Sequence, residues 1–196
     1  HGIRGYDGPV YASGWSFNIP TQDLVDAFDS GDKRKNSSIL DIAAWADANS
    51  AKYSEGYEHT GYFNNKYIPR SGYSKNTTEL NYENNYRYIR YADVLLMAAE
   101  ANNRGGISDS KAQTYLNQVR SRAGVSSISS SGTALTQAIW DERRLEFAGE
   151  GHRFFDLVRT GQAANEISGF ISGQHELFPI PQTEIDISGL TQNPGY

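Results

Sequence analysis

Residues 90–106, RYADVLLMAAEANNRGG, carry the most regular pattern in this chain. Strong helix formers fill the stretch, and a set of mostly apolar or aromatic residues follows helical spacing: Tyr88, Tyr91, Ala92, Leu95, Ala99 and Asn102. The pair Gly105 and Gly106 ends the pattern. The spacing therefore predicts a long helix with Leu95 on its inner face, and it also places Tyr86, Tyr88 and Tyr91 in the core.

A second helix follows the glycine pair at once. Ser108 can cap its first turn, Gly124 stands where a C-terminal glycine belongs, and an apolar stripe runs between them: Ala112, Tyr115, Leu116, Val119 and Ala123. Two helices joined by so short a turn form an antiparallel hairpin, the unit that tetratricopeptide-like repeats stack. No second copy recurs at a fixed period, so a repeat array within the chain is not indicated.

The remaining C-terminal segments are a third long helix, a short helix and a tail. The third helix is expected from about Thr133, with its inward positions at Leu135, Ala138, Ile139 and Phe147 and with Trp140 packed beside them. A short helix is expected around residues 154–158, beyond Gly149 and Gly151. From Phe178 onward three prolines predict an extended tail that lies across the helices.

The N-terminal half is less regular. Residues 2–18 are expected to be irregular or briefly extended, and a short helix is expected between Thr21 and Gly31. Ile39, Ile42 and Trp45 fit either a strand or a helical turn. Residues 53–85, rich in Tyr, Asn, Gly and Ser, predict surface loops with short strands around residues 62–68. The basic run Lys33–Lys35 is interpreted as a solvated turn.

Composition excludes several classes of protein. A chain of 196 residues with 38% hydrophobic residues, 21% charged residues and a net charge of −5 fits one ordinary globular domain and argues against nucleic-acid binding. The absence of cysteine rules out disulfides and thiolate chemistry. No apolar stretch approaches the roughly 20 residues of a membrane span. Because the sole methionine is Met97, the start at His1 is interpreted as a processed or excised end, with any lipid anchor upstream.

The tyrosine-rich loop segment at residues 53–85, together with Trp45 before it, is the main candidate for a ligand site. Sugar rings pack their C–H faces on aromatic planes while amides and phenols bind their hydroxyls. Residues of both kinds lie close together in this stretch, and the predicted ligand-binding set is Trp45, Tyr53, Tyr57, Tyr62, Asn64 and Tyr67. The alternative for any one of them is packing against the helices, since a pocket uses few residues.

A charged cluster near the C-terminus raises the question of catalysis. Its members are Glu142, Arg144, Glu146, Arg153, Asp156 and Arg159. Glu142 and Glu146, four residues apart, could suggest a glycosidase pair, but a hydrolase needs one protonated carboxyl and the nearby arginines favour the ionised form. A structural ion network between helices is the preferred interpretation. No catalytic residue, metal site or cofactor is predicted, since the histidines lack metal-site spacing.

Several motifs together resemble the SusD/RagB family of outer-membrane nutrient-binding lipoproteins. They begin with PTQDLVDAF at residues 20–28 and the helix at 90–101. The others are LNQVRSRAG at 116–124, ERRLEF at 142–147, EGHRFFDLVRTG at 150–161, FPIPQTEID at 178–186 and QNPGY at 192–196. They occur in the family's order from about residue 15 to the C-terminus.

The resemblance implies a mainly α-helical fold, with tetratricopeptide-like helical hairpins, irregular loops and a few short strands. It implies the C-terminal part of a SusD-like domain over residues 1–196, with a variable loop-rich segment at 15–85 and the signature helices and tail at 86–196. It also implies a lipid-anchored protein on the outer face of the outer membrane. The lipid anchor would be this protein's only membrane attachment, and it is absent from this chain.

The function implied is non-catalytic binding of an oligosaccharide or polysaccharide, with a SusC-like TonB-dependent transporter as partner. Two alternatives within the resemblance remain open. The chain could be a scaffold that contacts the transporter while the ligand site lies upstream, or it could bind peptide as RagB-like proteins do. Glycoside hydrolysis by Glu142 and Glu146 is the alternative from a different class.

Overall fold

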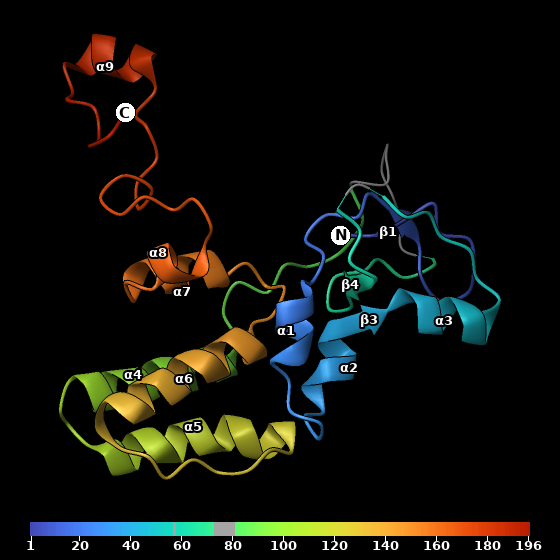
Figure 1. Ribbon diagram of the computed structural model, residues 1–196, viewed down its shortest axis with the longest axis horizontal. Helices are drawn as coiled ribbons and strands as arrows, with labels where there is room; N and C mark the ends of the chain where they lie inside the picture. The colour runs from blue at the N-terminus through green and yellow to red at the C-terminus, as the bar shows by residue number, and fades with distance from the viewer. Residues whose placement is uncertain (57, 73–80) are drawn as a thin grey trace. The chain divides into compact units, whose positions relative to one another are not determined.

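The computed structural model describes residues 1–56, 58–72 and 81–196. Helices dominate these residues and the strands are short (Figure 1). The chain divides into two compact units, His1–Gly151 and His152–Tyr196. The prediction of a mainly α-helical fold with helical hairpins and few strands is confirmed.

Three long helices form a bundle in the first unit. Helix α4 (Tyr91–Arg104) and helix α5 (Asp109–Ala123) make the predicted hairpin, and α6 (Gly132–Glu146) packs beside both (Figure 1). The Ser108 hydroxyl caps α5 by accepting from Lys111 N at 3.2 Å, and Gly124 closes it at φ 79°. The buried side chains between the helices include Leu95, Leu96, Ala99, Ala112, Leu116, Val119, Leu135, Ile139 and Phe147.

The tyrosines that lead into α4 lie outside this core. Tyr86, Tyr88 and Tyr91 expose 60%, 79% and 72% of their surface, so the prediction that they pack inside is wrong. The reason is local geometry. Arg90 is extended at φ −121° and ψ 157°, so the helix begins only at Tyr91, and the inner face is set by Leu95, Leu96 and Ala99.

The N-terminal part of the first unit has a core of its own. Strand β1 (Ile3–Arg4) pairs in parallel with β2 (Ser13–Gly14), and β3 (Ile39–Asp41) pairs antiparallel with β4 (Tyr62–Asn64), with Leu40 opposite Phe63. Helix α3 (Ile42–Asn49) follows β3 directly, capped by the Asp41 carboxylate. The buried cluster comprises Ile3, Tyr6, Tyr11, Leu40, Ile42, Phe63 and Ile68.

Two short helices connect this core with the helical bundle. Helix α1 (Gln22–Asp26) is capped by Thr21, and α2 (Arg34–Ser38) runs straight into β3. Val25, Phe28 and Ile39 form a buried cluster with Ala148, which follows α6. The choice left open by the sequence at Ile39, Ile42 and Trp45 resolves into a strand followed at once by a helix.

The second unit holds three short helices, α7 (Arg153–Arg159), α8 (Ala163–Glu166) and α9 (Gln182–Ser188). Helix α7 confirms the short helix that was predicted around residues 154–158. The prediction of an extended tail is wrong within residues 182–188, because α9 begins immediately after Pro181, whose φ of −54° suits a helix start. Among the described residues, no helix is both long and apolar enough to cross a membrane.

Candidate functional site

Three glutamates converge where α6 ends and the chain turns. Glu142 and Glu146 lie four residues apart on α6, and Glu150 follows one more turn of chain, past Gly149 at φ 74°. Each exposes at most 2% of its surface. Burial of a charged carboxylate is costly unless it is paired and hydrogen-bonded, so the cationic partners of these groups determine what the site can do.

Four arginines from three segments bind Glu142 and Glu146. Glu142 accepts from Arg34 Nη1 and Arg120 Nη1, both at 2.6 Å. Glu146 accepts from three guanidiniums, those of Arg34 at 3.1 Å, Arg90 at 2.9 Å and Arg122 at 2.5 Å. The pair thus ties α2, the start of α4 and α5 to α6, and the carboxylates are closed to any substrate.

Glu150 has a separate set of partners. Arg90 binds it through two parallel hydrogen bonds of 2.8 Å, and Lys66 Nζ donates to it at 2.7 Å. Burial raises the pKa of Glu150, but the hydrogen bonds and charges of Arg90 and Lys66 outweigh burial and hold that pKa below its usual value. Burial lowers the pKa of Lys66 in spite of its contact with Glu150.

Arg34 corrects the interpretation of the basic run as a solvated turn. It exposes only 6% of its surface and forms a fork on Asp32, with Nη2 to Oδ2 at 2.6 Å and Nε to Oδ1 at 2.9 Å. Burial raises the pKa of Asp32, but the hydrogen bonds from Arg34 outweigh it and leave that pKa lowered. The short charged run therefore supplies the central cation of a buried network.

Two members of the predicted ion network, Glu142 and Glu146, lie at the centre of the buried cluster, and Arg144 pairs with the exposed Asp23. Arg153, Asp156 and Arg159 belong to the second unit, where Arg153 binds Glu166 at 3.1 Å and Arg159 binds Asp156 at 2.8 Å. Their part in the network stays a prediction. Within the described residues, no group of three His, Cys, Asp or Glu side chains is placed to hold a metal ion.

Asp93 and Glu100 on α4 are also structural. Asp93 exposes 7% of its surface and accepts from Arg143 Nη1 at 2.7 Å. Glu100 accepts from Arg104 Nη1 at 3.0 Å and from Trp140 Nε1 at 3.0 Å. Trp140 is thus anchored against α4 by its polar edge.

This network gives a pH dependence with a defined sign. The folded-state pKa of Glu150 and of Asp32 lies below the unfolded value, so each contributes stability that is complete above about pH 4. The contribution is lost as the pH falls through the folded-state pKa. We expect the melting temperature to fall in acid below about pH 4, measured by circular dichroism. The Glu150→Gln variant should show a shallower decline, and an equal decline would contradict the role given to Glu150.

The described aromatic residues that were predicted to bind ligand pack against or within the cores of the first unit, and their role in ligand binding stays a prediction. Trp45 packs edge-on to Tyr11 at 5.0 Å between ring centroids and donates to Tyr6 Oη at 2.9 Å. Tyr53 packs against the same cluster and Tyr62 against the Val25 cluster. Tyr57 lies outside the described residues.

Asn64 and Tyr67, the other two candidates, are buried and expose only 2% and 6% of their surface. Asn64 Nδ2 donates to Gly149 O at 2.8 Å, and its Oδ1 accepts from Lys66 N at 3.2 Å, so the amide has a local structural task. The Tyr67 ring stacks on Tyr86 with centroids 5.9 Å apart. Neither side chain is presented at the surface.

Other aromatic rings do reach the surface of the N-terminal part. Trp15 exposes 43% of its surface and Phe17 exposes 57%. Both lie between β2 and α1, in the opening segment that was interpreted only as irregular. The available signal was two large aromatic residues in a stretch without helical or strand periodicity, which gives them no core face to occupy.

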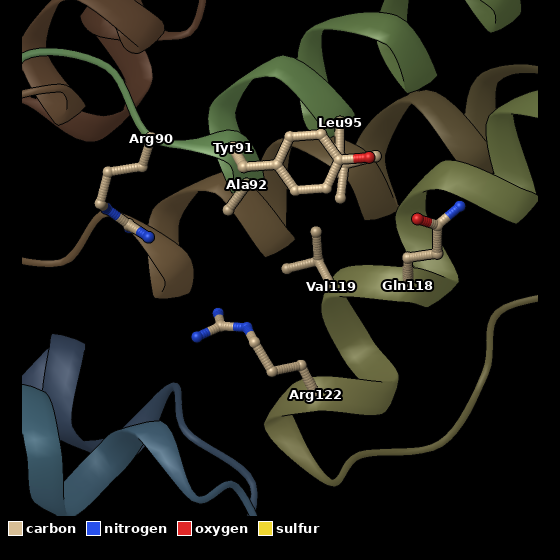
Figure 2. A pocket seen from close by; sticks show the side chains of 7 residues that line it. All are labelled: Arg90, Tyr91, Ala92, Leu95, Gln118, Val119 and Arg122. Carbon is tan, nitrogen blue, oxygen red and sulfur yellow. The ribbon is translucent and has the colours of Figure 1, made fainter.

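A groove of about 330 Å³ lies between α4 and α5 on the surface of the bundle (Figure 2). Ala92, Leu95 and Val119 line it, and Figure 2 shows Arg90 and Arg122 on one side with Gln118 on the other. Both arginines are already bound to Glu146, so the ion network forms this side of the groove.

Comparison with known proteins identifies relatives of this chain in sequence and in fold. The sequence profile described as SusD family matches residues 2–176. The SusD-like protein P2 of Formosa agariphila is 30% identical over the whole chain, which covers 43% of that relative. Among solved structures, a laminarin binding SusD-like protein is 44% identical with a TM-score of 0.85, and the chain covers 43% of it.

A second solved structure, surface glycan-binding protein A from Bacteroides thetaiotaomicron in complex with laminarihexaose, is 35% identical with a TM-score of 0.80. It covers 93% of this chain, and the match spans 42% of that protein. The chain therefore corresponds to less than half of the length of each of these three relatives.

Proposed function

Because this chain belongs to the SusD family, we propose that it is part of a non-catalytic glycan-binding protein whose ligand is a laminarin-type glucan. One observation carries the proposal: the likeness to a laminarin binding SusD-like protein extends over the whole chain at 44% identity. The laminarihexaose complex of a second relative supports the same class of ligand. We take residues 1–196 as the C-terminal part of the SusD-like domain.

The buried carboxylates support binding without hydrolysis. Glu142 and Glu146, the only pair with glycosidase-like spacing that the sequence suggested, expose 1% and 2% of their surface. All of the hydrogen bonds described above hold them to arginines from other segments. A glycosidic oxygen has no route to either group, whereas a general acid must come within hydrogen-bond distance of the atom that it protonates.

The cellular setting that we propose follows from family membership. A SusD-like protein of this kind would be lipid-anchored at the outer face of the outer membrane and would deliver glycan to a SusC-like TonB-dependent transporter. The alternative is a scaffold role, in which this chain contacts the transporter and the ligand site lies elsewhere in the protein. The burial of Asn64 and Tyr67, and the packing of Trp45 and Tyr53 against the N-terminal cluster, give that alternative a specific basis.

Affinity electrophoresis in gels that contain laminarin, xylan or pectin tests the proposal. We expect retardation in laminarin, little or none in the other gels, and no release of reducing ends on prolonged incubation. Release of reducing sugar that is lost in Glu142→Gln would contradict the non-catalytic proposal. Unretarded migration of the folded protein in laminarin would favour the scaffold alternative.

A further inference from the structure

We propose that Trp15, flanked by Arg4 and Phe17, is the platform on which this chain stacks a sugar ring of the glucan. The inference rests on the proposed function and names a place for it that the sequence motifs do not indicate. These three residues are called the Trp15 platform below. Its two aromatic rings are more exposed than any described residue of the predicted ligand-binding set.

The first support is the way in which Arg4 holds the tryptophan. Its guanidinium lies 5.4 Å from the centroid of the Trp15 ring, and its Nη2 donates to Trp15 O at 3.2 Å. One side chain thus fixes both the ring and its backbone, and Trp15 still exposes 43% of its surface. A large ring that is held in place yet open to solvent stacks on a sugar at little conformational cost.

The second support is backbone strain that packing does not explain. Val10, Ser16 and Asn18 have φ values of 74°, 60° and 56°, a region that residues with a side chain seldom adopt and that is an outlier for β-branched valine. Such strain costs of the order of 1–3 kcal/mol for each residue and gathers at ligand sites. Here two of the three strained residues flank the exposed rings of Trp15 and Phe17.

The third support is the set of contacts that holds the strained segment rigid. Gly2 and Gly14 approach so closely that a Cβ on Gly14 would lie 2.2 Å from Gly2 Cα. Ser16 N donates to Gly2 O at 2.8 Å, and Asn18 Nδ2 donates to Gly149 O at 3.0 Å. The segment is therefore preorganised, although Trp15 and Phe17 keep 43% and 57% of their surface exposed.

The polar surroundings favour a sugar over a protein partner. Arg4 Nε and Ser16 Oγ are buried without a hydrogen-bond partner among the described residues. Burying unpaired polar atoms costs folding free energy, which adds to the backbone strain beside the Trp15 ring. Two aromatic rings are much smaller than the roughly 800 Å² that each partner buries in a stable protein interface. A single sugar ring, apolar on its faces and polar at its rim, matches a surface of this size and character.

Calorimetric titration with laminarihexaose tests the platform. We expect Trp15→Ala to weaken binding roughly tenfold to a hundredfold, because a large apolar contact is removed, and Trp15→Phe to retain most of the affinity. Tyr88→Ala, which removes a ring exposed by 79% elsewhere in the same unit, is the matched control and should bind like the wild type. Melting curves establish that each variant is folded.

Tryptophan fluorescence gives a second readout. The chain has three tryptophans, and Trp45 and Trp140 are partly buried, so ligand should shift the emission of the wild type and not that of Trp15→Phe. If the wild type binds and Trp15→Ala binds equally well, the platform is excluded while the proposed function stands. If the wild type binds no laminarihexaose, both fail together. A transporter contact that is lost in Trp15→Ala with glycan binding intact would also overturn the inference.

Discussion

Replacement of Glu146 by glutamine is expected to lower the free energy of unfolding by about 3–5 kcal/mol, since it breaks a buried ion network by removing one partner. Glu146 exposes 2% of its surface and accepts from Arg34, Arg90 and Arg122. A neutral amide keeps the shape of the carboxylate but removes the negative charge to which these guanidiniums are bound. For a chain of this length the melting temperature should fall by roughly 6–20 °C.

Thermal unfolding followed by circular dichroism measures this effect. Glu55→Gln is the matched control, since the same chemical change at an exposed position should alter the stability by less than about 0.5 kcal/mol. Equal melting curves for Glu146→Gln and Glu55→Gln would show that the network does not hold α2, α4 and α5 to α6. The account of the carboxylates as structural groups would then be wrong.

Replacement of Phe63 by alanine is expected to cost about 3–5 kcal/mol as well, through the lost burial and the cavity that remains. Phe63 is completely buried in strand β4, opposite Leu40, within the N-terminal cluster. Phe155→Ala makes the same change at a ring that exposes 67% of its surface and should have a small effect. Chemical denaturation compares the two, and a Phe63→Ala variant as stable as Phe155→Ala would contradict the core described for this region.

The sequence was informative wherever periodicity was long. Helical spacing, caps and glycine stops predicted α4, α5 and α6, because three or more turns of amphipathic pattern leave little choice of inner face. It failed at Tyr86, Tyr88 and Tyr91, where the pattern was extended one turn before the helix start at Tyr91. Aromatic residues beyond a helix end have no periodicity to place them.

The ion network shows why long-range contacts were missed. Glu142 and Glu146 were identified as structural, but their partner Arg34 lies 108 residues from Glu142 in the sequence. Only the fold brings that short basic run beside α6. The predicted members Arg153, Asp156 and Arg159 are close to Glu146 in sequence, and the pairs Arg153–Glu166 and Arg159–Asp156 form in the second unit.

The ligand candidates illustrate a related limit. A segment rich in tyrosine and asparagine has the composition of a sugar site and equally that of a small core with polar edges. Asn64 is buried in β4, which pairs with the distant strand β3, and Trp45 packs against the same core through Tyr6 and Tyr11. Trp15 was passed over because its segment has no periodicity, although its ring stays exposed.

The central claim is that this chain contributes to glucan binding, and a calorimetric titration of laminarihexaose into the protein tests it most directly. Cooperative melting first establishes that the protein is folded. The account predicts a saturable heat of binding with about one hexasaccharide for each chain. A folded protein that gives only the heat of dilution, with laminarihexaose in large excess, would contradict it.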